Sequence, residues 1–251
     1  MASFATSPVD RGALAASACI LLLSALAWGW QVHEAAAMAA MGAMRMPATD
    51  WLTLQAVFAL LMWISMMQAM MLPAALPVLL LYRRCLQRDA RRTLKLLLFC
   101  TAYGLLWSAF GALMTCLQAF GEQLGWLDPM ALRLPPLLGA AILVLAGGYQ
   151  LSQAKATCLA HCQSPLQFLQ QHARPGLSGA WRLGLQHGLY CLGCCWALML
   201  LLLVVGAMNL WGMVLLALLV LAEKCLALGA RWRLASGALL ISGGLLLGWL
   251  G

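Results

Sequence analysis

The chain has 251 residues, of which 64% are apolar and only 9% are charged. A water-soluble domain normally carries about a quarter charged residues, so this composition excludes an ordinary soluble domain and favours a surface covered by lipid. The net charge of +8 is compatible with nucleic-acid binding, but the basic residues gather in alternate connections between apolar runs. That pattern is typical of membrane topology, and we expect the lipid bilayer rather than nucleic acid as a partner.

The apolar runs are continuous and about 20 residues long, which is the length of a membrane-spanning helix and not of a barrel strand. In lipid, every backbone polar group must be satisfied inside the protein. The sequence therefore predicts an all-α, polytopic transmembrane helix bundle that forms one integral domain over residues 1–251. In chain order we expect about seven spans, over residues 12–30, 51–82, 94–120, 134–151, 180–206, 210–228 and from 234 to the end.

The charges of the connections predict the orientation of the bundle. The connection between the second and third runs has six basic side chains and one acidic one, whereas the connections after the first and third runs are weakly acidic. Basic connections stay on the cytoplasmic side, so we expect a cytoplasmic N-terminus in a multi-pass protein of a bacterial inner membrane. Residues 153–180 would be the longest cytoplasmic segment, where Pro165 and Pro175 argue against one long helix.

Two glycine pairs indicate close helix packing inside the bundle. Gly184 and Gly188, and likewise Gly244 and Gly248, have the spacing of small residues that lets two helix backbones approach each other. We expect these glycines to serve packing and not chemistry.

The run from His187 to Met199 contains the strongest chemical signal. On a helix, the side chains of His187, Cys191, Cys194 and Cys195 fall within an arc of about 100°, and Met199 continues the stripe. A buried imidazole in a membrane is costly without a partner, and imidazole with thiolate suits Cu(I) or Zn(II), while thioether favours Cu(I). We predict a metal site with His187, Cys191, Cys194 and Cys195 as ligands; packing of small apolar thiols is the alternative.

A second cluster precedes this run. Cys158, His161 and Cys162 share one face if their segment is helical, and the topology puts them on the same side of the membrane as the first cluster. We predict that they supply or receive metal at the cytoplasmic end, the alternative being a solvated histidine beside unrelated thiols. By contrast, we interpret Cys116 as a packing residue.

Methionines form a third signal, in the second run. Met62, Met66 and Met70 share a face and would be weak, exchangeable metal sites, as would Met199. Met67 and Met71 lie on an adjacent face, so the whole set covers about half of the helix circumference. That breadth is equally typical of flexible apolar packing.

The second run also contains two prolines, which affect its backbone. Pro73 and Pro77 each remove a helical hydrogen bond, which frees the carbonyl groups of Ala69 and Pro73 at a predicted kink.

The outward connection before this run has the character of either a Met-rich copper-capture loop or an interfacial segment; its residues of interest are His33, Met38, Met41, Met44 and Met46.

Several sequence blocks resemble a bacterial family of predicted metal-binding integral membrane proteins whose domain has no assigned function. The blocks are the run from Met66 to Pro77, the run from His187 to Met199, a short one that begins at Gly206, the pair Glu223 and Lys224, and a weaker region that includes Cys162, Pro165 and Phe168. The resemblance covers residues of about 50 to 228 and implies metal binding without a mechanism.

Together these patterns favour a transition-metal-binding membrane protein that takes up, handles or delivers Cu(I), with zinc as the other metal. We expect inward transfer, because the ligands become softer from the outer Met segment to the inner thiols, and Glu223 would support the ligands. A copper chaperone or another metalloprotein is the expected exchange partner, and the sequence leaves an oligomer open.

Two other functions stay open at this stage. Cys191 and Cys194 have the CxxC spacing of a thiol–disulfide relay, and the chain could be a scaffold or assembly subunit of a membrane complex. The sequence contains no P-loop and no catalytic constellation, so a metal-binding or transport role is favoured over an enzyme.

Overall fold

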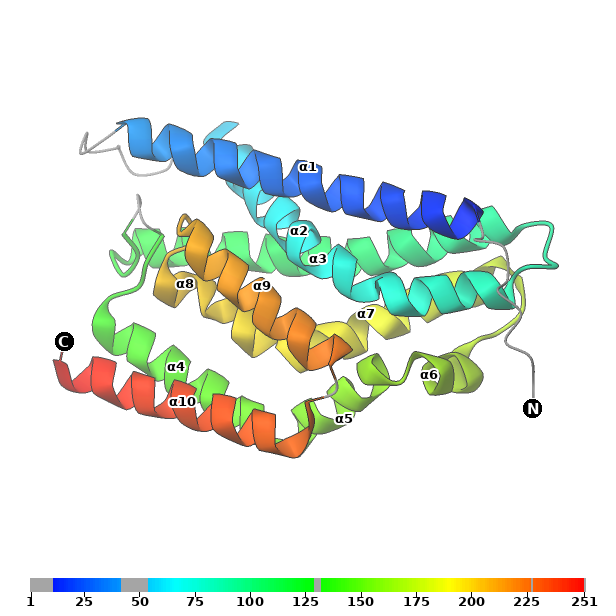
Figure 1. The fold of residues 1–251 in the computed structure, drawn as a ribbon. Helices are drawn as coiled ribbons and strands as arrows, with labels where there is room; N and C mark the ends of the chain where they lie inside the picture. The colour runs from blue at the N-terminus through cyan, green and yellow to red at the C-terminus, as the bar shows by residue number, and fades with distance from the viewer. Residues whose placement is uncertain (1–10, 42–53, 129–131, 227, 251) are drawn as a thin grey trace.

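The computed structural model describes residues 11–41, 54–128, 132–226 and 228–250 (Figure 1). Its regular elements are helices, which confirms the all-α prediction for this part of the chain. They are α1 (Arg11–Met41), α2 (Leu54–Cys85), α3 (Arg92–Gln123), α4 (Pro136–Leu151), α5 (Gln153–Gln163), α6 (Pro165–His172), α7 (Gly176–Leu200), α8 (Leu202–Val205), α9 (Leu210–Cys225) and α10 (Gly229–Leu250).

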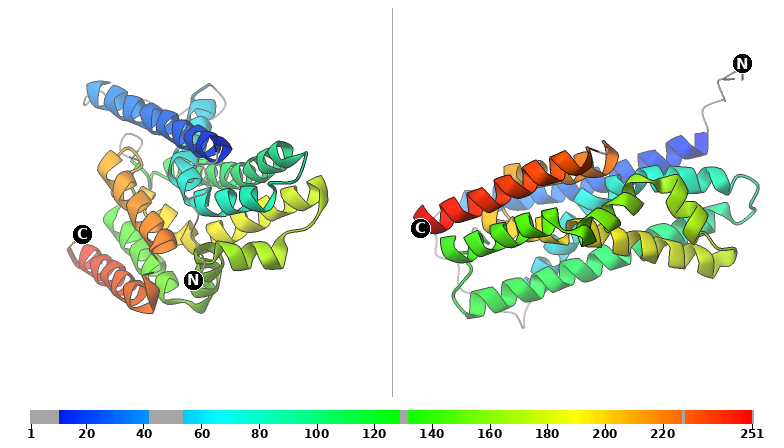
Figure 2. Two further views of the ribbon diagram at one scale, coloured as in Figure 1. Left: turned by 45° about the vertical axis from the view of Figure 1, so that its right-hand side comes forward. Right: turned by 90° about the horizontal axis from the view of Figure 1, so that it is seen from below.

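The helices form a bundle in which α2 packs between α1 and α3, α3 packs on α7, and α4 packs on α10. α1 lies along one edge of the bundle and the α4–α10 pair lies along the opposite edge (Figures 1 and 2). The start of α1 and the basic α2–α3 connection lie at one end, while the α3–α4 connection and the end of α10 lie at the other (Figure 1). This alternation is the one that the charge pattern predicts.

Among the described residues, five helical stretches are long and apolar enough to cross a membrane. They comprise Leu14–Ala37, Ala56–Cys85, Arg92–Gln123, Gly176–Val205 and Gly229–Leu250. α4 reaches the required length only together with α5, from which it is bent by 64°. The 16 residues of α9 rise by about 24 Å, which is short of a hydrocarbon core of about 30 Å. The seven expected spans are therefore matched in part.

Two segments expected to be loops are helical. α1 continues to Met41, beyond the expected end at residue 30, because Ala and Met favour helix; Gln31 anchors it by donating to the Met62 carbonyl (3.1 Å) and the Ser65 hydroxyl (2.7 Å). Met44 and Met46 lie outside the described residues. The expected cytoplasmic segment contains α5 and α6, which are separated where Pro165 opens α6, a position that tolerates proline.

The prolines of α2 act as expected on its backbone. α2 continues through Pro73 and Pro77 but changes direction along its length (Figure 1). The Ala69 carbonyl, which loses its helical donor to Pro73, accepts a hydrogen bond of 2.8 Å from the Ser24 hydroxyl of α1. A buried carbonyl thus finds a partner on the neighbouring helix, and the bend is held by a tertiary contact.

Glycines set the closest helix contacts, as their spacing predicts. A Cβ atom on Gly184 would lie 2.4 Å from the Phe99 carbonyl oxygen of α3, and one on Gly244 would lie 2.9 Å from the Ala140 carbonyl oxygen of α4. Real Cβ atoms do not approach oxygen so closely, so both helix pairs require glycine there.

Two adjacent glycines of α4 provide a test of this packing. A Cβ atom on Gly147 would lie 2.7 Å from the Gly237 carbonyl oxygen of α10, whereas one on Gly148 would meet nothing within 4 Å. We expect Gly147→Ala to lower the free energy of unfolding by about 1–3 kcal/mol through overpacking. Gly148→Ala should be neutral or slightly stabilising, because alanine is the better helix former. Thermal unfolding of the detergent-solubilised protein would measure both, and equal stabilities would contradict the packing described here.

Candidate metal centre

Two thiols and one thioether surround a buried ammonium group where α7, α2 and α9 meet. The Lys224 Nζ atom of α9 lies 2.9 Å from the Cys191 Sγ, 3.7 Å from the Cys195 Sγ and 3.8 Å from the Met71 Sδ atom of α2. The Cys195 Sγ atom is itself 4.0 Å from the Met71 Sδ atom. All four side chains are buried, so a cation-binding set of sulfur atoms lies inside the protein.

Tyr103 of α3 ties this cluster to the backbone of α2. Its hydroxyl donates a hydrogen bond of 2.9 Å to the Met71 carbonyl and lies 3.0 Å from the Cys191 Sγ atom. The buried hydroxyl thereby has the partners that a tyrosine needs away from water. Met71 and Cys191, which are far apart in sequence, are held in one place by this contact.

A row of thiols leads away from the cluster. Cys191 and Cys195 are one helical turn apart on α7, and Cys194 directly precedes Cys195 in the chain. Cys162 of α5 packs against the core that contains these three thiols. The Cys194 and Cys195 thiols also donate to the Cys191 carbonyl, at 3.1 and 2.7 Å. The row therefore runs from the partly exposed Cys162 to the fully buried Cys191.

His187 lies one turn before Cys191 but in aromatic surroundings. Its ring centroid is 5.8 Å from that of Phe99, 5.6 Å from that of Tyr103 and 5.2 Å from that of Phe168. Its buried Nδ1 atom has no hydrogen-bond partner among the described residues. A buried polar atom of this kind needs a partner, and a metal ion could provide one.

The four ligands predicted on α7 do not surround a single point. Within the described ranges, no three His, Cys, Asp or Glu side chains come close enough together to hold one ion. A ligand set made of His187, Cys191, Cys194 and Cys195 therefore stays a prediction. The set that the geometry brings together instead is Cys191, Cys195 and Met71.

The second predicted cluster is divided between two surroundings. Cys162 joins the thiol row. Cys158 packs against Gly193 of α7, and a Cβ atom added to Gly193 would lie 2.8 Å from the Cys158 Sγ atom. His161 instead stacks on Tyr190, with ring centroids 4.1 Å apart.

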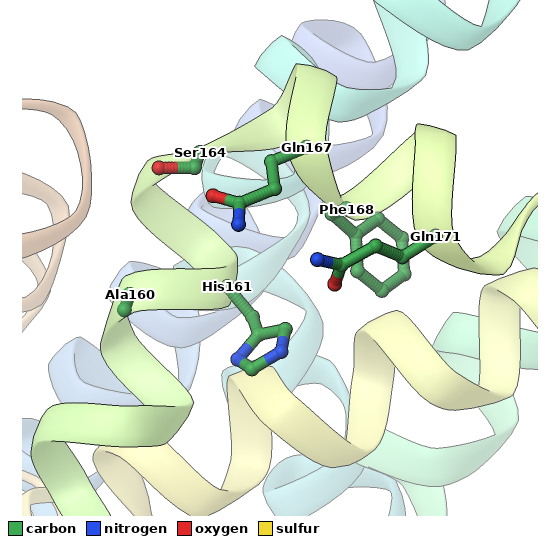
Figure 3. Close-up of a pocket in the computed structure, with 6 residues that line it drawn as sticks. All are labelled: Ala160, His161, Ser164, Gln167, Phe168 and Gln171. Carbon is green, nitrogen blue, oxygen red and sulfur yellow. The ribbon is translucent and has the colours of Figure 1, made fainter.

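A cleft of about 250 Å³ lies between α5 and α6, and His161, which directly precedes Cys162 in the chain, forms part of its lining. The His161 ring and the amide groups of Gln167 and Gln171 point toward it, and Phe168 forms part of its wall (Figure 3). His161 is thus placed at a polar opening and not among the thiols, which suits exchange at the surface better than a place in a buried site.

Glu223 and Lys224 face different neighbours, because adjacent residues on a helix point about 100° apart. Glu223 forms a buried ion pair with Lys155 of α5 (2.7 Å) and accepts a hydrogen bond from Gln150 of α4. Gln163 donates to the Glu223 backbone carbonyl at 2.7 Å. Glu223 thus holds α4, α5 and α9 together. It supports the sulfur cluster indirectly, because it fixes the part of α9 that carries Lys224.

The methionines of α2 are core residues. Met62, Met66 and Met70 are buried in the same cluster as the three thiols of α7, as is Met199. Sequence reasoning placed Met71 on an adjacent face and gave Lys224 no part in a site. A lysine in an apolar helix faces the protein interior or, near a helix end, reaches the interface; Lys224 lies in the last turn of α9, so the sequence alone does not decide between the two.

The donor atoms fit a soft monovalent metal ion. Thiolate and thioether sulfur suit Cu(I), and thiolate also suits Zn(II); all ten cysteines are free thiols in the structure. The cluster also contains a fixed cation, which is the Lys224 ammonium group. The arrangement can therefore accept a second small cation if its thiols give up protons.

One comparison with known proteins identifies a family. A family model described as PpoB2, copper chaperone, matches residues 60–247, which includes most of α2 and nearly all of α10. The match confirms that the chain resembles a metal-related family, as the sequence predicts, and it extends beyond the expected limit at residue 228. No curated protein and no solved structure matches the chain.

The buried pair of Lys155 and Glu223 should be essential for stability. We expect Lys155→Met to lower the free energy of unfolding by about 3–5 kcal/mol, because it leaves a buried carboxylate without its cation. The double variant Lys155→Met/Glu223→Leu should recover part of this loss, since it removes both charges. Thermal unfolding would measure the series, with Lys95→Met as a control at a surface pair with Asp89. A double variant that is less stable than Lys155→Met would contradict the pairing.

Proposed function

Because the chain belongs to the copper chaperone family PpoB2, we propose that it binds Cu(I) through sulfur and hands it on. The observation that carries this proposal is the buried group formed by the thiols of Cys191 and Cys195 and the thioether of Met71 around one cation. Sulfur donors in a place without water favour a soft ion over Mg²⁺ or Ca²⁺, which need oxygen ligands.

We propose further that the protein works within a bacterial inner membrane. Five stretches long and apolar enough to cross a bilayer and the low charge of the chain support this location. Cys191 lies about midway along the stretch Gly176–Val205, so the α7 thiols would lie near the middle of the bilayer. A soluble copper chaperone could not explain so many exposed leucines on the outer helices, such as Leu22, Leu26 and Leu239.

The thiol row suggests how the ion moves. A Cu(I) ion can pass between neighbouring sulfur atoms by forming a bond to the next before it leaves the last, and each thiol that binds gives up its proton. Cys194 of α7 and Cys162 of α5, which packs against the same core, would extend the route from Cys191 and Cys195 toward the cleft that His161 lines. Transfer would be inward, and a copper chaperone or another metalloprotein would receive the ion there.

Other candidate ligands have supporting places in this scheme. Met62, Met66, Met70 and Met199 would bind weakly and release easily, as movement requires. His187 would use its unpartnered Nδ1 atom on the ion, and Cys158 would assist beside Cys194. Zn(II) is the competing metal, because thiolate and imidazole also suit it.

Metal binding by Cys191 and Cys195 can be measured directly. We expect the purified full chain to bind Cu(I), and Cys191→Ser/Cys195→Ser to lower the bound copper at least tenfold at equal free copper, since two thiolate bonds are lost. Elemental analysis and X-ray absorption at the copper edge would report the amount and the sulfur ligands. Cys116→Ser, which changes an exposed thiol of α3, is the matched control.

The same samples separate the copper and redox functions. A double variant with full copper content would contradict copper binding at these thiols. A mixed disulfide trapped on Cys191 or Cys194, together with copper-free wild-type protein, would favour the thiol–disulfide relay. A stable complex that is unaffected by loss of all three α7 thiols would favour a scaffold.

Cys162 should affect transfer more than binding. We expect Cys162→Ser to keep the copper content of the wild type but to slow copper transfer to an added chelator at least tenfold, because it removes the exposed end of the row. Stopped-flow absorbance would follow the transfer, with Cys225→Ser as a control at an exposed thiol of α9. An unchanged rate would exclude this route.

A further inference from the structure

Lys224 is a buried cation whose close neighbours are sulfur atoms rather than a carboxylate. Its side chain is 6% exposed, and in the described part of the chain no carboxylate lies within 4 Å of its Nζ atom; its contacts are with Cys191, Cys195 and Met71. The adjacent Glu223 is already neutralised by Lys155. The positive charge of Lys224 is therefore available to whatever negative charge the thiols carry.

The charge of the centre depends on the ion that it holds. Two thiolates with one monovalent ion carry one negative charge, and the Lys224 ammonium makes the total neutral. Two thiolates with one divalent ion are already neutral, and the ammonium leaves one positive charge in excess. An uncompensated charge inside a protein is strongly unfavourable, and more so within a bilayer.

We propose that Lys224 is a specificity residue that makes this centre select monovalent soft ions, Cu(I) and Ag(I), over Zn(II). The inference rests on the proposed function, because it takes Cys191 and Cys195 as the ligands. It adds what the sulfur atoms alone do not provide, since thiolates bind Zn(II) as well as Cu(I). Selectivity then comes from a fixed charge beside the ligands and not from the ligands themselves.

The experiment compares affinities for Ag(I), Cu(I) and Zn(II) in the purified full chain by competition with chromophoric chelators. Ag(I) is included because it is monovalent and does not change its oxidation state under these conditions. The variants are Lys224→Met, which removes the charge and keeps most of the length, Lys224→Gln, which is neutral and polar, and Lys224→Arg, which keeps the charge. Lys95→Met removes a lysine charge away from the centre and is the control.

We expect the wild type to prefer Ag(I) and Cu(I). Lys224→Met and Lys224→Gln should lower the ratio of Ag(I) to Zn(II) affinity at least about tenfold, while Lys224→Arg and Lys95→Met keep it. An unchanged ratio in a folded neutral variant overturns the inference. If neither neutral variant folds, the wild type decides it, because a preference for Zn(II) overturns the inference and a preference for Ag(I) supports it.

The failure of this inference is distinguishable from that of the proposed function. If wild-type protein and Cys191→Ser/Cys195→Ser bind Ag(I) equally, the ligands themselves are wrong and the proposed function fails. If the serine variant loses Ag(I) but the neutral Lys224 variants keep the wild-type ratio, only the role of Lys224 fails.

Discussion

A buried ammonium group without a carboxylate constrains the centre of this protein. Lys224 can remain inside the bundle only because sulfur, and not hydrocarbon, surrounds its Nζ atom. That requirement brings α2, α7 and α9 to one point, although Met71 and Lys224 lie far apart in the sequence. Tyr103 adds α3 by donating to the Met71 carbonyl. The core of the bundle is therefore organised around a polar cluster as well as around its apolar packing.

The helices that hold this cluster owe their positions to simple local features. Gly184 lets α7 approach the backbone of α3 closely, which brings Tyr103 to Cys191. Pro73 frees the Ala69 carbonyl, and the hydrogen bond from Ser24 fixes the bend of α2 against α1. Each feature is a backbone effect of a single residue, and together they determine where the sulfur atoms meet.

Helix periods and charge patterns predicted much of this fold from the sequence, but little of the contact between helices. The positions of the spans followed from apolar length, and the shared face of Cys191 and Cys195 followed from the period of 3.6 residues. What the period cannot give is the partner on another helix. Met71 was placed on the face of α2 adjacent to that of Met62, Met66 and Met70, because the sequence of one helix does not reveal which face meets α7. Glu223 was expected to support the ligands for the same reason. The extension of α1 to Met41 was missed for another reason. The stretch after residue 30 is rich in alanine, which favours helix, but His33 and Glu34 interrupt the apolar run from which the end of the span was predicted.

The two buried lysines show how charge is allocated between structure and chemistry. Lys155 and Glu223 neutralise each other and join α5 to α9, so this pair contributes no net charge to the thiols. The next residue, Lys224, points about 100° away and brings its charge to the sulfur atoms. Because Lys155 and Glu223 neutralise each other, Lys224 alone determines the fixed charge beside the sulfur cluster. A buried centre with a defined fixed charge discriminates between ions by their valence, which donor atoms alone cannot do when both ions accept thiolate.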